Sequence, residues 1–233
     1  MYKRQLAALT EKVFVTSRLF AGYSGALDAD VLAQLIAALP QGAPGETAAH
    51  KRYDAAACAV EIPADVGFCA LGHNLYALGS SYSGACPVLS SLVSYGYLWN
   101  MVRVQGGAYG TGMNVRRSGD IFCYSYRDPN LDNTRAVFSA VADFIENFAA
   151  QGMPLDDIII GAVNTTDPLL DPAGVCESQC VRALKGVTPE ELAKTRHELL
   201  ATKPADLAAM ADVLRKYARE GKFCTFSGTN GGA

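Results

Sequence analysis

Residues 97–138, with the sequence YLWNMVRVQGGAYGTGMNVRRSGDIFCYSYRDPNLDNTRAVF, decide the fold class. The segment begins in an apolar helical run, passes through a glycine-rich turn and continues as two extended runs that flank Ser118 and Gly119. A serine–glycine pair between two β-rich runs favours a hairpin. An amphipathic helix is predicted to follow over 131–150. A strand pair bracketed by helices indicates a sheet against which helices pack.

The flanking segments extend this pattern in both directions. Residues 84–102 are apolar nearly all round, which predicts a helix that is buried on most sides. Residues 55–62 and 66–75 are predicted to form a pair of strands joined by a short turn. The remaining predicted elements are a strand over 11–20, a helix over 28–39 capped by Asp28, helices that begin after Thr188 and Thr202, and a last strand over 222–228.

Strands in hairpin-like pairs with helices grouped after them favour an α+β fold. We expect a mostly antiparallel sheet with helices packed on one face. The 233 residues are enough for a substantial core, and the sequence shows no internal repeat and no low-complexity segment. We therefore expect a single domain over 1–233, with 1–10 as a connecting segment.

The composition narrows the classes of partner and compartment. The net charge of −3 gives no basic footprint, so nucleic acid is disfavoured as a partner. No apolar run approaches the roughly 18 residues that a membrane span needs, so no membrane partner is expected. The seven cysteines are odd in number and scattered, which indicates reduced thiols in a cytoplasm-like compartment. An organelle matrix meets the same requirement.

A zinc site is the first chemistry to test, and the sequence argues against one. A helical zinc site needs two imidazoles one turn apart with a carboxylate nearby. None of the three histidines, His50, His73 and His197, belongs to such a pair. Cys176 and Cys180 would share a helix face, but no second pair has matching spacing, so an ordinary buried pair is favoured. No metal or cofactor is expected in this chain.

The glycine-rich stretch at 106–112 is not a phosphate-binding loop, because here a helix precedes and a strand follows. Arg103 and Tyr109 flank this turn. Gly106, Gly107 and Gly110 remove side-chain bulk, so another backbone could approach closely. A guanidinium and a phenol in such a place are suited to donate hydrogen bonds to peptide carbonyls. Residue types alone favour the plainer alternative, in which Arg103 caps the C-terminus of the helix and Tyr109 is a packed aromatic.

Other polar residues carry weaker signals. Arg116, Arg117 and Arg127 lie near the predicted hairpin, where a solvated sheet edge is the favoured interpretation. The sequence has no Gly-x-Ser-x-Gly nucleophile elbow. An independent hydrolase with a cysteine or serine nucleophile therefore stays a rival without a supporting motif.

The strings RVQGGAYG (103–110) and YSYRDPNL (124–131) are long and specific. They closely resemble the last domain of the presequence proteases, in the insulinase (pitrilysin) superfamily, and the resemblance extends more loosely over about 10–228. Members of that superfamily are zinc metallopeptidases built from four α+β domains in two bowl-shaped halves. The first domain carries the zinc motif His-x-x-Glu-His, and the last domain closes over it with an arginine and a tyrosine.

The resemblance implies roles for the turn residues. Tyr109 would donate to the scissile carbonyl and its developing oxyanion, and Arg103 would hold a neighbouring carbonyl of the substrate. Gln105, Gly106 and Gly107 belong to the same implied substrate-binding motif. The expected function is therefore substrate binding and active-site completion in a zinc metalloendopeptidase that degrades unfolded peptides.

This sequence departs from the family in lacking the zinc motif and in being far shorter than a complete member. Zinc is therefore expected in a missing catalytic half, and the chain alone is expected to be inactive. The implied partners are a peptide substrate and that zinc-bearing half, with the chain either an excised C-terminal domain or a separate subunit. The rivals are a non-catalytic partner subunit of a two-subunit peptidase and a scaffold that kept only the fold.

Overall fold

The computed structural model describes residues 2–42 and 56–228. The chain divides into two compact units, which we call the helical unit (Met1–Tyr53 with Leu169–Thr188) and the sheet unit (Asp54–Pro168 with Pro189–Ala233). The expectation of a single domain over 1–233 stays a prediction. Among the described residues, no helix has both the length and the apolar character that crossing a membrane requires.

The helical unit contains α1 (Tyr2–Val13), the 3-10 turn η1 (Thr16–Arg18), α2 (Ala29–Ala37) and α7 (Pro172–Leu184). The predicted strand over 11–20 is wrong. Residues 11–13 are the last residues of α1, and residues 16–18 form the 3-10 turn η1 with its local hydrogen bonds. The predicted helix over 28–39 is confirmed. Its cap is Asp28, whose carboxylate accepts from the backbone N–H groups of Asp30 and Val31 at 3.0 and 3.1 Å.

The sheet unit is built on five strands, which are β1 (Cys58–Glu61), β2 (Gly67–Asn74), β3 (Gly110–Val115), β4 (Asp120–Asp128) and β5 (Lys222–Ser227). Their order is β1-β5-β2-β4-β3, and every neighbouring pair is antiparallel except β1 with β5. The predicted α+β class with a mostly antiparallel sheet is confirmed. The predicted pairing of 55–62 with 66–75 is wrong, because β5 lies between these strands. Local turn signals carry no information on a strand from the far end of the chain.

The hairpin predicted around Ser118 and Gly119 is confirmed. The Arg116 N–H donates to the carbonyl of Asp120 at 2.8 Å, which closes the turn between β3 and β4. Gly119 has a φ of +94°, a conformation that only glycine adopts without strain. The serine–glycine pair was therefore a correct turn signal.

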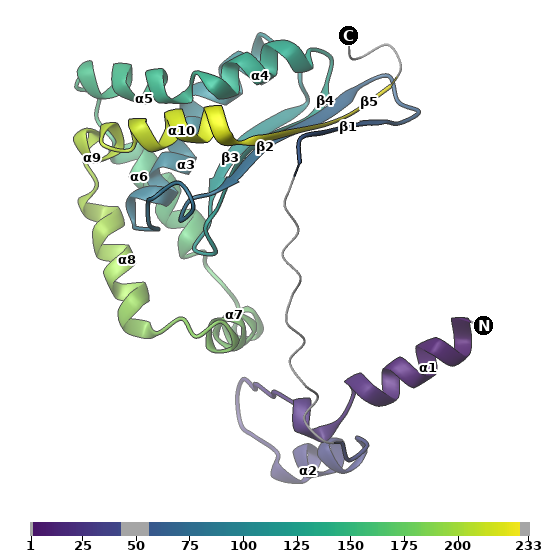
Figure 1. The fold of residues 1–233 in the computed structure, drawn as a ribbon. Helices are drawn as coiled ribbons and strands as arrows, with labels where there is room; N and C mark the ends of the chain where they lie inside the picture. Colours follow the sequence, from purple (N-terminus) through teal and green to yellow (C-terminus); the bar gives the residue numbers. More distant parts are fainter. Residues whose placement is uncertain (1, 43–55, 229–233) are drawn as a thin grey trace. The chain divides into compact units, whose positions relative to one another are not determined.

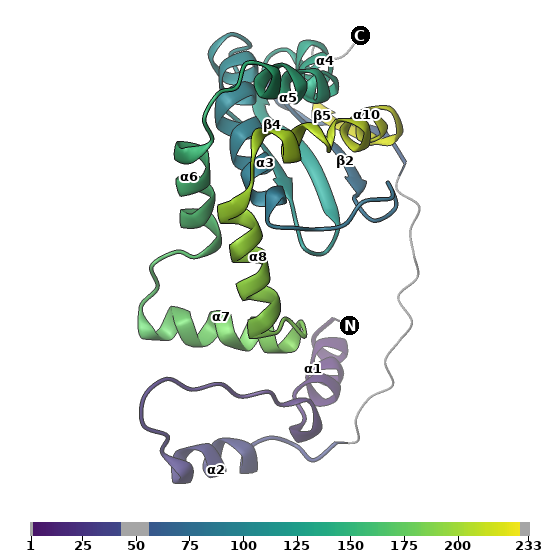
Figure 2. The same ribbon diagram turned by 90° about the vertical axis from the view of Figure 1, so that its left-hand side faces the viewer.

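Helices cover one face of this sheet (Figures 1 and 2). Those that contact the strands are α3 (Ala85–Val93), its continuation as the π-helix η2 (Ser94–Val104), α4 (Leu131–Ser139) and α10 (Ala211–Glu220). Packed against these helices are α5 (Val141–Ala150), α6 (Asp156–Thr166), α8 (Pro189–Ala201) and α9 (Pro204–Ala208). The covered face buries Leu71, Met113 and Cys123. Tyr124 and Tyr126 point to the other face and stay partly exposed. The sheet thus has one core face and one open face.

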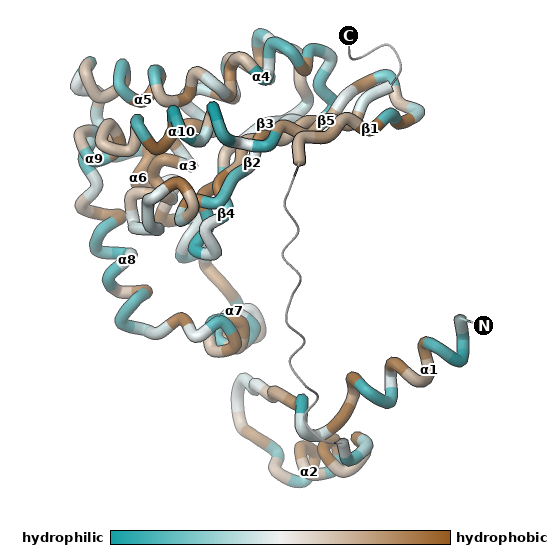
Figure 3. Tube along the Cα trace, viewed as in Figure 1, coloured by the Kyte–Doolittle hydropathy of each residue, from teal (hydrophilic) through white to brown (hydrophobic). Residues whose placement is uncertain are grey.

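Two helix predictions need correction. The run 84–102 forms a helix, and Figure 3 shows the apolar character of α3 and α6. The predicted burial holds for α3, in which no residue is exposed, but fails for η2, where Tyr95 and Trp99 are 69% and 41% exposed. The helix predicted over 131–150 is two helices, since Ala140 (φ −91°, ψ 7°) leaves the helical conformation between them.

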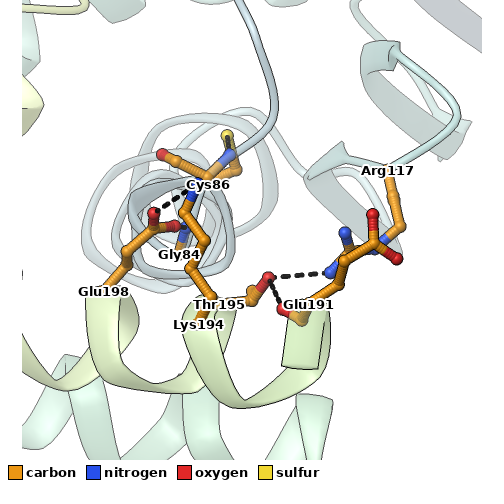
Figure 4. Close-up of polar contacts among 8 residues, drawn as sticks. Gly84, Cys86, Arg117, Glu191, Lys194, Thr195 and Glu198 are labelled. Atoms are coloured by element: carbon orange, nitrogen blue, oxygen red, sulfur yellow. Dashed lines mark hydrogen bonds and ion pairs between the residues drawn. The ribbon is translucent and has the colours of Figure 1, made fainter. Parts of the chain in front are cut away.

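Polar contacts join helix α8 to the start of α3 and to the turn between β3 and β4 within the sheet unit (Figure 4). The Gly84 N–H donates to Glu198 Oε2 at 2.9 Å, and Arg117 Nη2 donates to Thr195 Oγ1 at 2.8 Å. A Cβ at Gly84 would lie 2.2 Å from the backbone nitrogen of Leu199, so only glycine allows α3 and α8 to approach this closely.

Candidate functional site

Arg103 and Tyr109 lie on either side of the tight turn between η2 and β3. The Gly107 N–H donates to the Arg103 carbonyl at 3.0 Å, and Gly107 has a φ of +80°. A Cβ at Gly106 would lie 2.5 Å from the Val102 carbonyl oxygen. The glycines are thus required by the turn itself, and the predicted helix-to-strand order is what the structure has. All five predicted site residues, Arg103, Gln105, Gly106, Gly107 and Tyr109, fall within this one turn.

Tyr109 is held by its backbone and leaves its ring in solvent. Its N–H donates to the Arg127 carbonyl at 3.2 Å, while its side chain is 59% exposed. The ring centre of Tyr126 lies 5.5 Å away, and the Arg127 guanidinium carbon lies 5.6 Å away. Tyr109 therefore packs on one side against Tyr126, as the alternative of a packed aromatic has it, but most of its side chain is exposed. From this exposed side chain the hydroxyl can meet a second molecule.

Arg103 is positioned by Trp99. Its guanidinium carbon lies 3.9 Å from the Trp99 ring centroid, which is cation–π stacking, and 6.0 Å from the Tyr109 ring centroid. Within the described part of the chain, Arg103 has no carboxylate partner. The stack fixes the plane of the guanidinium while its charge and its N–H donors remain available.

Sequence reasoning missed the two aromatic residues that precede Arg103. Residues four apart lie on the same face of a helix, one turn above the other. The ring centres of Tyr95 and Trp99 are 6.5 Å apart, and Arg103 continues the row. The spacing of four was visible in the sequence. This spacing was given no functional interpretation because the helix was predicted to be buried on most sides.

This row forms one wall of a cleft of about 320 Å³. The cleft lies between the α3–η2 helix and strand β3, and its opposite wall includes Tyr124 and Tyr126 of β4. Burial raises the pKa of Tyr124, so this hydroxyl stays protonated at neutral pH. Among the described residues that line the cleft, Arg103 is the only charged one.

The other candidates do not join this site. Arg117 is engaged by Thr195, and Arg116 lies over Phe122 at 5.0 Å. His50 lies outside the described residues, and the His73 ring contacts the backbone of Asn74. Across 2–42 and 56–228, no three metal-ligating side chains come together. The donor set of this part of the chain therefore does not fit a zinc site.

Comparison with known proteins gives the family. Residues 58–226 match the family model described as the PreP C-terminal domain. Protein HypA of Clostridium perfringens is 31% identical over 160 residues, which are 69% of this chain and 16% of that protein. Presequence protease 1, chloroplastic/mitochondrial, of Arabidopsis thaliana is 34% identical over 157 residues, or 67% of this chain and 14% of that protein. The match thus spans only a small part of each curated relative.

Solved structures show the same fold. The peptidase M16 inactive domain from Pseudomonas fluorescens superposes with a TM-score of 0.62 at 14% identity, covering 99% of this chain and 58% of that chain. A putative zinc protease from Bordetella pertussis gives 0.52 at 12% identity, covering 71% and 96%. The family model covers well over half of the sequence. The chain therefore belongs to the PreP C-terminal domain family, the C-terminal domains of insulinase-type peptidases.

Proposed function

We propose that this chain binds peptide substrate and completes the active site of a zinc metalloendopeptidase that degrades unfolded peptides. The observation that carries the proposal is that an exposed Tyr109 lies near Arg103, which has no carboxylate partner in the described part of the chain. Both residues flank a turn whose glycines leave its backbone uncovered by side chains. Two directed donors on bare backbone suit the recognition of a peptide main chain.

The geometry suggests how the two donors divide the work. The Tyr109 hydroxyl would donate to the scissile carbonyl and to the oxyanion that develops there. Arg103, 6.0 Å from the Tyr109 ring, would donate to a carbonyl about two residues away along an extended peptide, which rises roughly 3.3 Å per residue. Gln105, Gly106 and Gly107 would let the substrate backbone pass close to the turn. Binding at two points fixes the register of the peptide before reaction.

Zinc and its general base would come from a separate catalytic half, since the donors described here do not fit a metal site. An oxyanion donor without that half has no hydrolysis to assist, so the chain alone should be inactive. The partners are accordingly a zinc-bearing half and an unfolded peptide. We expect the assembled peptidase to act in a reducing compartment, either the cytoplasm or an organelle matrix, where seven free thiols are stable.

Three of the seven thiols are unsuited to serve as the nucleophile of an independent cysteine hydrolase, because they are buried. Burial raises the pKa of Cys69 to about 11 and that of Cys123 to about 12. Burial also raises the pKa of Cys86. A thiol of this kind is almost entirely protonated at neutral pH and is a poor nucleophile.

The role of Arg103 is tested in a peptidase assembled from this chain and a separately expressed zinc-bearing half. Arg103→Met should raise KM and lower kcat/KM by about 10-fold to 100-fold, as expected when a charged hydrogen bond to substrate is lost. Arg219→Met, which removes an exposed arginine on α10, is the matched control and should leave both constants unchanged. Equal constants for Arg103→Met and the control would contradict the proposed role.

A further inference from the structure

Part of the sheet edge at the cleft is closed to an added strand. Strand β3 is at the edge of the sheet, but in its second half the outward groups of Met113 and the N–H of Val115 are already bonded to the covering helix. The Met113 N–H donates to Ser94 Oγ at 2.9 Å, and the Val115 N–H donates to Ser90 Oγ at 3.0 Å. Ser94 also donates back to the Met113 carbonyl at 3.2 Å. Beside Met113 and Val115, recognition must therefore come from side chains rather than from the main-chain pairing of an added strand.

One wall of the cleft is a fixed aromatic surface. A Cβ at Gly110 would lie 2.3 Å from the Tyr126 ring, and a Cβ at Gly112 would lie 2.9 Å from the Tyr124 hydroxyl. The two glycines thus let both rings lie close over β3. The rings are stacked, with centres 6.4 Å apart and planes 20° from parallel. Rings seated this way present flat apolar surface at little conformational cost.

The opposite wall carries the Tyr95–Trp99–Arg103 row. Tyr95 and Trp99 are exposed although they are large and aromatic. Aromatic rings from η2 and from β4 line this cleft, and its volume of about 320 Å³ is near the lower limit of small-ligand sites. That volume suits one large side chain and not a whole peptide.

We propose that this cleft binds an uncharged aromatic side chain of the peptide substrate, and so selects which residue lies beside the Arg103–Tyr109 turn. Ring-on-ring contact with Trp99 and Tyr126 supplies the attraction. The single positive charge of Arg103 disfavours lysine and arginine side chains in the cleft. The identity of the occupant as substrate rests on the proposed function, whereas the aromatic preference rests on the cleft itself.

Trp99 makes a direct test available, because it is the only tryptophan in the chain. Tryptophan emission of the isolated chain is recorded during titration with acetylated, amidated pentapeptides that differ only at the central residue. Phenylalanine at the centre should give a saturable change in emission. Alanine, lysine and glutamate should each need at least tenfold more peptide for the same change. Equal responses to all four peptides, no response to any, or tighter binding of the glutamate peptide than of the phenylalanine peptide would overturn the proposal.

Two variants locate the effect while they retain Trp99. Tyr95→Ala removes an exposed ring from the wall and should weaken phenylalanine binding about threefold to tenfold, the usual effect of losing one aromatic contact. Thr166→Phe at the end of α6 should fill the cleft and abolish the saturable response. Tyr23→Ala and Asn164→Phe lie outside the cleft lining and are the matched controls. Wild-type titrations for both cleft variants would contradict the assignment.

The titration uses no zinc-bearing half, so its outcome is independent of hydrolysis. A positive titration with no activity in the assembled peptidase would contradict the proposed function but support the aromatic site in the cleft. An active assembled peptidase with no aromatic preference in the titration would contradict the aromatic site but support the proposed function.

Discussion

Tyr217→Phe should destabilise the sheet unit by far more than the loss of one atom suggests. Tyr217 comes from α10 and is fully buried. Its hydroxyl donates to the Leu71 carbonyl of β2 at 2.7 Å and accepts from the Cys123 N–H of β4 at 2.9 Å. The variant would leave both buried backbone groups without this partner. Each such loss costs about 1–3 kcal/mol, so we expect the free energy of unfolding to fall by about 2–6 kcal/mol.

Urea unfolding followed by far-UV circular dichroism measures this change. The midpoint should move to lower urea with an unchanged slope, because the surface exposed on unfolding is nearly the same. Tyr95→Phe is the matched control, since that tyrosine is largely exposed, and it should stay within about 0.5 kcal/mol of wild type. A loss below about 0.5 kcal/mol for Tyr217→Phe would refute the account of α10 as a bridge between β2 and β4.

Three further predictions concern the same unit. Burial raises the pKa of the Cys123 thiol to about 12 in the folded state, whereas the unfolded thiol titrates near 9. The contribution of Cys123 to the free energy of unfolding should therefore be fully present below pH 9 and fall by about 1.4 kcal/mol per unit of pH above it. Denaturant titrations from pH 8 to 11 should show a shallower fall for Cys123→Ala. Gly84→Ala should lower the free energy of unfolding by about 1–3 kcal/mol, because the added Cβ would meet the backbone of α8. Gly161→Ala is the control: its Cβ would make an ordinary 3.4 Å contact, so thermal melts should show no destabilisation. Gly110→Ala should displace the Tyr126 ring and weaken phenylalanine-peptide binding severalfold in the Trp99 emission titration, and an unchanged titration would speak against the aromatic wall.

Local patterns predicted most of the elements in the sheet unit. The β3–β4 hairpin followed from its turn residues, and the alternation of Ile121 and Cys123 with Phe122 and Tyr124 matches the two faces of the sheet. The partner of β1 could not be predicted, because β5 comes from the far end of the chain and pairs with it in parallel. Pairing over such distances depends on the whole fold and not on any turn.

The candidate site was predictable in part. Arg103 and Tyr109 lie on a glycine turn that is visible in the sequence, but residue types alone favoured a helix cap and a packed aromatic. Tyr109 does lie against the Tyr126 ring, but its side chain is 59% exposed, which the sequence did not indicate. Trp99 and Tyr95 were hidden because an apolar helix was expected to be buried, and nothing in the sequence indicated that η2 would lie at the edge of the sheet as a π-helix.

The central claim is that this chain completes an active site whose metal lies elsewhere. The most direct measurement is peptide cleavage by the purified chain alone, then after mixing with a separately expressed zinc-bearing half, with wild type and Tyr109→Phe compared. The account predicts no cleavage by the chain alone, cleavage after mixing, and turnover lower by roughly 10²–10³ for Tyr109→Phe, with Tyr23→Phe as wild type. Cleavage or stoichiometric zinc in the chain alone, or unchanged turnover for Tyr109→Phe, would contradict it.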